Sequence, residues 1–227
     1  MNKTKYGIFC IIFVLSLCFC TNAFAAVSAF QTEPIADKDK TDFLSAINIT
    51  LLNEEPQKDA IDYFDVTEDG LLVVTHSDYD NTKYICVYDK TEFLCGYSLT
   101  AYGNVLVECA DENINIHFFR GNYMVSVDQN EVVDVVLVTE TAENNRRLTD
   151  YINTKEKTVD GKTYTAENDT GLFKVFSSKY TKITLKEDNT ETVIYDVSDH
   201  YFRKSLIGYG IGIIIIVISF VRARKIM

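Results

Sequence analysis

The chain has 227 residues, a formal net charge of −11 at pH 7, and no tryptophan. All 33 acidic residues lie between Phe30 and Arg203, against 16 basic residues in the same stretch, so this central region carries a net charge of −17. Nucleic acid and anionic lipid both need a basic face, and this charge therefore argues against either as its partner.

Residues 1–25 have the pattern of a secretory signal peptide. Two lysines precede an uncharged apolar run over residues 6–20, and small residues follow it. Ala23-Phe24-Ala25 places the cut before Ala26, and Val27-Ser28-Ala29 is a second possible cleavage site. An uncleaved anchor helix is the alternative, because an apolar run of this length can barely span a bilayer. Both interpretations place the following chain outside the membrane.

Residues 26–45 are mostly polar and charged, and we expect them to form a flexible lead-in. Residues 46–203 then alternate short runs of Val, Ile, Tyr and Phe with turn residues, which is typical of an all-β domain. Strands are predicted over residues 47–52, 62–66, 71–76, 84–89, 93–98, 104–108, 114–119, 123–128 and 132–138. The pattern breaks at residues 139–157, where we predict a short surface helix, and it resumes with a strand at 162–166.

The β-rich region contains an internal repeat. Residues 84–94 align with residues 123–133 at an offset of 39 without a gap, and each copy reads as a strand, an Asp-x-x-Glu turn and a strand. A third copy of the turn is Asp188-Asn189-Thr190-Glu191. A period near 40 residues with four strands per unit is typical of β-propeller blades.

These segments resemble the blades of NHL or YncE-like β-propellers. The resemblance rests on the turn Glu68-Asp69-Gly70, the strand at residues 71–74, and the strand at residues 85–89 with its hairpin. The chain also looks like a group of small bacterial single-pass membrane proteins with such blades. The resemblance implies a mainly β fold of antiparallel four-stranded blades, without catalytic residues. Because only about three units are present, where propellers have four to eight, we expect an incomplete propeller or a curved, sandwich-like β-domain.

A second apolar run, Ser205 to Val221, predicts a transmembrane helix. As a helix it is about 25 Å long, a little short of the hydrocarbon core. A buried strand pair is the alternative, but three basic residues follow within the tail at residues 222–227, and such residues mark the cytoplasmic side. Gly208 and Gly212 share one helix face and would permit close approach of another helix.

Three cysteines lie outside the leader: Cys86, Cys95 and Cys109. A hairpin centred on Lys90-Thr91 places Cys86 opposite Cys95. A cross-strand disulfide is possible there, but two core thiols are favoured, because the preferred Cβ separation of a disulfide is near 3.8 Å and paired strands hold Cβ atoms farther apart.

No pattern of catalytic or metal-binding residues stands out. His76, His117 and His200 are far apart in sequence and lack metal-ligand spacing. The turn Asp78-Tyr79-Asp80-Asn81 offers oxygen ligands for calcium, but a solvated turn is the favoured interpretation. We therefore name no catalytic, cofactor-binding or metal residue, and we expect no cofactor.

The sequence thus predicts a protein of the cell membrane with a single span and an extracytoplasmic N-terminal domain. We expect a non-enzymatic binding module whose partner is a membrane or envelope protein, and not a nucleic acid. The alternatives are an accessory subunit of a transporter or sensor complex, and a surface hydrolase.

Overall fold

The computed structural model describes residues 28–111, 113–128, 131–171, 174, 179–188 and 190–207. The expected signal peptide, the cytoplasmic tail and the expected span from residue 208 onward lie outside this part of the chain. Among the described residues, no helix combines the length and the apolar character needed to cross a membrane.

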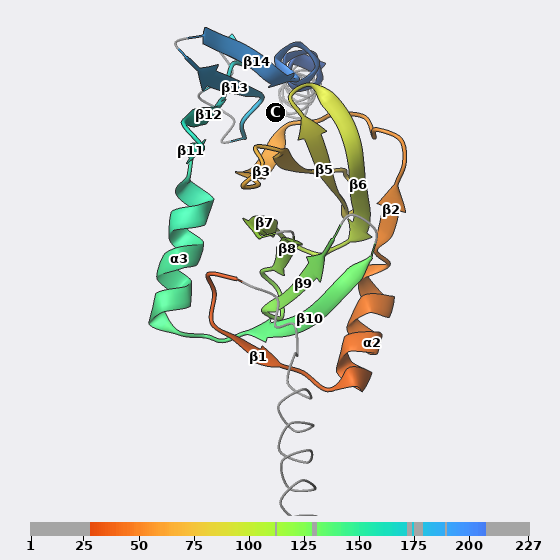
Figure 1. The fold of residues 1–227 in the computed structure, drawn as a ribbon. Coiled ribbons are helices and arrows are strands. Elements are labelled where there is room, and N and C mark those ends of the chain that lie inside the picture. Colours follow the sequence, from red (N-terminus) through yellow and green to blue (C-terminus); the bar gives the residue numbers. More distant parts are fainter. Residues whose placement is uncertain are drawn as a thin grey trace, which may run out of the picture.

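The described chain is mainly β, and its strands form three antiparallel sheets (Figure 1). In each sheet four strands pair in the order in which they occur along the chain. The first sheet contains β3 (Ile61–Val66), β4 (Leu72–Ser77), β5 (Thr82–Asp89) and β6 (Glu92–Thr100). The second contains β7 (Val105–Ala110), β8 (Asn113–Phe118), β9 (Tyr123–Val127) and β10 (Val132–Val138). The third contains β11 (Glu156–Val159), β12 (Lys162–Glu167), β13 (Lys182–Glu187) and β14 (Thr190–Asp196).

Two hydrophobic cores hold the three sheets together. Alternate residues of a strand point to opposite faces, and the first sheet is buried on both. Val73, Ile85 and Val87 face a core shared with the second sheet. Leu72 and Cys86 face the opposite core, shared with the third sheet. The first sheet therefore lies between the other two, which explains why β4 is buried along almost its whole length.

The first strands of the three sheets meet around Asp65, which is buried on β3. One carboxylate oxygen accepts a hydrogen bond from the Cys109 backbone N–H of β7 at 2.9 Å. The other lies 3.0 Å from Nζ of Lys157 on β11. A buried carboxylate needs such partners to offset its loss of hydration, so this contact fixes how the three sheets are arranged.

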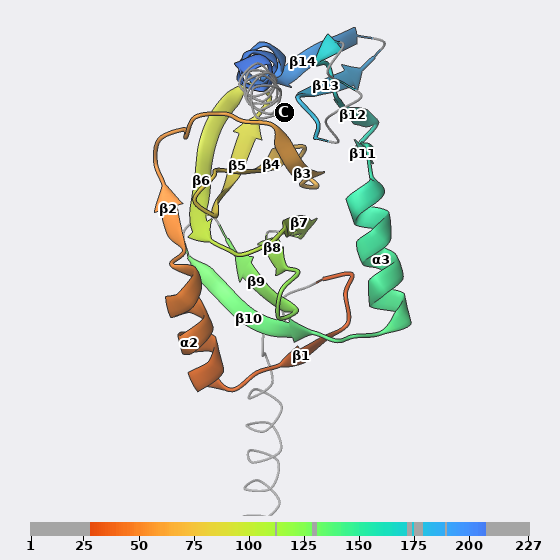
Figure 2. The ribbon, with the colours of Figure 1, turned by 180° about the vertical axis from the view of Figure 1, so that it is seen from behind.

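We expected a flexible lead-in over residues 26–45, but its described part, residues 28–45, and the residues that follow it form regular structure. β1 (Thr32–Pro34) pairs with β10, α2 (Asp37–Ile47) follows, and β2 (Thr50–Leu52) pairs with β6. The segment thus adds a fifth strand to the first and second sheets, and α2 lies along their outer side (Figure 2). Phe43 of α2 stacks on Tyr123 with ring centroids 4.2 Å apart. Tertiary contacts of this kind outweigh the weak local signal of a polar sequence.

Most predicted strands are confirmed within a few residues. The exception is the strand expected at residues 47–52, because Ile47 ends α2 and the strand begins only at Thr50. The predicted surface helix is α3 (Ala142–Asn153), which joins β10 to β11 (Figure 1). Thr141 caps this helix, since its hydroxyl accepts a hydrogen bond from the Asn144 N–H at 3.1 Å.

Cys86 and Cys95 do not face each other. Asp89 pairs with Glu92 and Tyr88 with Phe93, as a hairpin centred on Lys90-Thr91 requires. The register then shifts by one residue, so that Cys86 pairs with Gly96 and Val87 with Cys95. A one-residue shift moves a side chain to the other face of the sheet, and the two free thiols belong to different cores.

Candidate functional site

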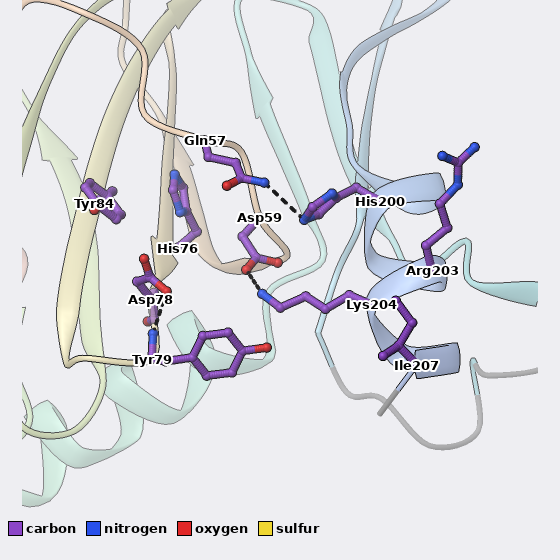
Figure 3. Close-up of a pocket in the computed structure, with 11 residues that line it drawn as sticks. Gln57, Asp59, His76, Asp78, Tyr79, Tyr84, His200, Arg203, Lys204 and Ile207 are labelled. Carbon is purple, nitrogen blue, oxygen red and sulfur yellow. Dashed lines mark hydrogen bonds and ion pairs between the residues drawn. The ribbon is translucent and has the colours of Figure 1, made fainter. Parts of the chain in front are cut away.

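A cleft of about 490 Å³ lies between the end of β4 and a helix formed by residues 198–207. We call it the helix cleft (Figure 3). The segment before β3 and the β4–β5 turn form one wall, and the helix forms the other. Its lining combines aromatic, acidic, basic and apolar side chains: Gln57, Asp59, His76, Ser77, Asp78, Tyr79, Tyr84, His200, Arg203, Lys204 and Ile207.

The β4–β5 turn is held by its own carboxylates. Asp78 accepts a hydrogen bond from the Tyr79 N–H at 2.7 Å, and Asp80 accepts one from the Thr82 N–H at 2.9 Å. Hydrogen bonds from Thr82 lower the pKa of Asp80. Asn81 completes the turn with a φ of 68°, a conformation that asparagine tolerates. The turn thereby presents the Tyr79 ring, which is 83% exposed.

Lys204 joins the two walls of the helix cleft. Its ammonium forms an ion pair with Asp59, and it lies 4.5 Å from the centre of the Tyr79 ring. Partial burial acts to lower the pKa of Lys204, but the hydrogen bond and the charge of Asp59 raise it above its ordinary value. Next to this contact, His200 Nε2 lies 3.5 Å from Gln57 Nε2. The helix is therefore fixed to the segment before β3 by polar contacts.

His76 forms the floor of the cleft beside a thiol. It is only 1% exposed, its ring centroid lies 5.0 Å from that of Tyr84, and its Nε2 lies 3.8 Å from Sγ of Cys86. Burial lowers the pKa of His76 to about 4 and raises the pKa of Cys86 to about 12. Both groups are thus neutral at pH 7. A nucleophilic cysteine requires the thiolate, so this pair lacks the charge state of a catalytic dyad.

A second hollow, of about 660 Å³, lies at the beginning of β3, beside the end of α3. It is rich in amide, lysine and tyrosine side chains, and it is lined by Ile61, Asp62, Tyr63, Asn104, Ile152, Asn153, Lys155, Asn168, Lys174, Lys179 and Tyr180. Lys179 pairs with Asp62 at 2.7 Å. Such a surface can bind polar molecules by hydrogen bonds, but none of the residues that line it belongs to the helix.

The residues singled out in the sequence are only partly brought together. His76, His200 and the Asp78–Asn81 turn meet at the helix cleft, whereas His117 lies in the second sheet against Phe30, with ring centroids 4.2 Å apart. Burial lowers the pKa of His117 to about 4. No set of three or more His, Cys, Asp and Glu side chains in the described part of the chain is arranged to hold a metal ion.

Gln57, Asp59 and Lys204 are cleft residues that the sequence reasoning did not name. Gln57 and Lys204 lie 147 positions apart in a sequence without any motif that links them. Only the packing of the third sheet on the first brings the helix that follows β14 to the segment before β3. Comparison of the chain with family models, with curated proteins and with solved structures found no match. The geometry of the cleft is therefore what supports a function.

Proposed function

We propose that this chain is a single-pass membrane protein whose extracytoplasmic β domain binds an envelope protein or an extracellular ligand through the helix cleft, without catalysing a reaction. The observation that carries this proposal is the position of the cleft. One of its walls is the helix of residues 198–207, which leads directly into the apolar run that begins at Ser205. A ligand in the cleft would thus touch both the domain and the start of the membrane anchor.

The chemistry of the cleft supports binding. Aromatic side chains beside a few charged groups are typical of recognition sites. The carboxylate of Asp59 is paired with Lys204, and that of Asp78 accepts a backbone hydrogen bond within its own turn. The His76–Cys86 pair is neutral and its members are at most 1% exposed. These groups give the cleft shape and polarity, and they do not supply an activated nucleophile or base.

We also propose that the domain is a partial β-propeller of three blades. Three features support it: each sheet contains a four-stranded meander, the sheets pack face to face, and the first strands of the meanders meet around Asp65. Closed propellers need at least about four blades. In this domain α3 runs along the side opposite the first sheet, where a further blade would otherwise stand (Figure 1).

The proposal is tested by site-specific photocrosslinking in intact cells. The full chain carries the photoreactive residue p-benzoylphenylalanine in place of Gln57, which is exposed in the cleft. A matched chain carries it in place of Leu94, an exposed residue near the start of β6 that does not line the cleft. We expect a discrete adduct from position 57 that is absent at position 94 and is lost when Asp59→Lys alters the cleft. Equal crosslinking at both positions, or no adduct at position 57, would contradict binding at the cleft.

A further inference from the structure

Ten large apolar side chains are exposed among the described residues; six of them, such as Tyr102 at 68%, lie singly on different strands, helices and loops, and the other four belong to the two segments that border the helix cleft. Among the described residues, Tyr79 is 83% exposed, Phe202 38%, Leu206 51% and Ile207 64%. All four belong to the β4–β5 turn or to the helix of residues 198–207. Single exposed apolar residues are normal on a protein surface, but a group of them marks a place that contacts something less polar than water.

The position of Tyr79 is fixed relative to the start of the anchor. Its ring lies 4.5 Å from the ammonium of Lys204, and Lys204 immediately precedes Ser205, where the apolar run begins. Figure 3 shows the Tyr79 ring directed toward Lys204 and Ile207. If the run crosses the bilayer, Lys204 lies at the level of the lipid headgroups, and the Tyr79 ring must lie there too.

The chemistry of this corner fits a bilayer interface. Tyrosine is enriched at both membrane surfaces because its ring is apolar and its hydroxyl is polar, and lysine and arginine extend their charged ends toward water beside it. The ion pair between Lys204 and Asp59 neutralises one acidic group at this corner. Arg203 lies in the same turn of the helix. The remaining charge of the domain makes a zwitterionic lipid surface a better match than an anionic one.

We propose that the β4–β5 turn rests in the membrane interface, with Tyr79 inserted among the lipid headgroups, so that the helix cleft opens at the bilayer surface. This inference rests on the proposed membrane anchor and deepens it. The domain is then held against the bilayer at two points, the helix and the turn, and does not swing freely on a tether. A ligand reaches the cleft along the lipid surface, and the partner of the turn is the lipid itself.

The absence of tryptophan from the chain provides a direct test. Two full-length variants each carry a single tryptophan, Tyr79→Trp and Leu94→Trp. Both native side chains are exposed, at 83% and 47%, so neither change disturbs a core. Each variant is reconstituted into phosphatidylcholine vesicles with and without bromine on the upper part of the acyl chains, because bromine quenches tryptophan fluorescence only at short range.

We expect brominated lipid to reduce the fluorescence of the Tyr79→Trp variant several-fold more than that of the Leu94→Trp variant. Equal quenching, or none at position 79, overturns the inference. Flotation of the same vesicles on a density gradient tests the membrane anchor separately from the contact of the turn with lipid. A protein that floats without quenching at position 79 retains the anchor and lacks the contact of the turn, whereas a protein that does not float contradicts both.

Discussion

At the scale of single residues, Glu108 shows how the N-terminal segment is fixed to the domain. Its side chain is 1% exposed on β7 and accepts hydrogen bonds from the Ser28 hydroxyl at 2.5 Å and the Ala29 N–H at 2.8 Å. Asn115 Nδ2 donates a further one at 3.1 Å. Donors surround this carboxylate, which is how a buried acidic group avoids a large desolvation cost.

Replacement of Glu108 by Gln should destabilise the domain. The amide would turn an N–H₂ group toward one or more of the donors that now meet a carboxylate oxygen, leaving buried groups without partners. We expect a loss of about 1–3 kcal/mol in the free energy of unfolding, measured by denaturant titration. Glu156→Gln, at an exposed position on β11, is the matched control and should change little. An equal effect of the two changes would contradict the role assigned to Glu108.

The contacts of Ser28 and Ala29 also distinguish the two possible cleavage sites of the leader. A cut before Ala26 keeps both residues, whereas a cut after Ala29 removes the two donors that Glu108 accepts from. We therefore expect mass spectrometry of the membrane-extracted protein to find Ala26 at the N-terminus. A mature chain that begins at Phe30 would contradict this expectation.

His117 should make the stability of the domain depend on pH. Burial lowers its folded-state pKa to about 4, while the pKa in the unfolded chain stays near 6.5. Between these values the unfolded chain binds a proton that the folded one does not, so stability falls as the pH drops from 6.5 to 4. The loss amounts to about 3 kcal/mol for this residue alone.

The measurement is denaturant unfolding at pH 7 and at pH 4.5. For His117→Phe, we expect the loss of stability between the two values to be about 2–3 kcal/mol smaller than for the unaltered protein. Met124→Leu, at a buried position without a titratable group, is the control and should leave the loss unchanged. An undiminished loss in His117→Phe would show that the buried imidazole does not cause the effect.

At the scale of elements, α2 lacks a good N-cap. Ala36 occupies that position in an extended conformation, with φ −66° and ψ 146°, and no side chain accepts a hydrogen bond there. Serine or aspartate at an N-cap accepts one from the first turn of a helix. We expect Ala36→Asp to raise the free energy of unfolding by about 1 kcal/mol.

Thr141→Ala, which removes the cap of α3, should lower the free energy of unfolding by a similar amount. If neither change alters this free energy, the roles assigned to the two caps are contradicted.

Most strands could be predicted from the sequence, whereas the structure of the N-terminal segment and the register of the β5–β6 hairpin could not. Short apolar runs between turn residues identified β3 to β10, because burial of alternate side chains leaves a local pattern. The pattern of α2 is weak, since Ile47 is its only buried residue and tertiary contacts decide its structure. The register shift at Val87 in the β5–β6 pair likewise leaves no pattern in the local sequence. Because of this shift, Cys86 and Cys95 are not opposite each other, as a regular hairpin centred on Lys90-Thr91 would place them.

At the scale of the whole molecule, the stacking of the sheets determines the candidate site. The third sheet packs on the first through a core that includes Tyr88 and Tyr195. The Tyr195 hydroxyl also donates a hydrogen bond to the Asp59 carbonyl at 2.8 Å. This contact places the helix after β14 against the segment before β3. Sequence reasoning named His76 and His200 without joining them, because their shared place in the helix cleft depends on sheets that lie far apart along the chain.

The central claim, an extracytoplasmic domain on a single span, is tested most directly by labelling in intact cells with a membrane-impermeant maleimide. One variant carries Asp150→Cys on the exposed side of α3, and another carries a cysteine appended after Met227. The unaltered protein gives the background, which should be low because burial raises the pKa of Cys86, Cys95 and Cys109. The account predicts that position 150 is labelled in intact cells and the C-terminal cysteine only after permeabilisation. Labelling of the C-terminal cysteine in intact cells, or protection of position 150, would contradict it.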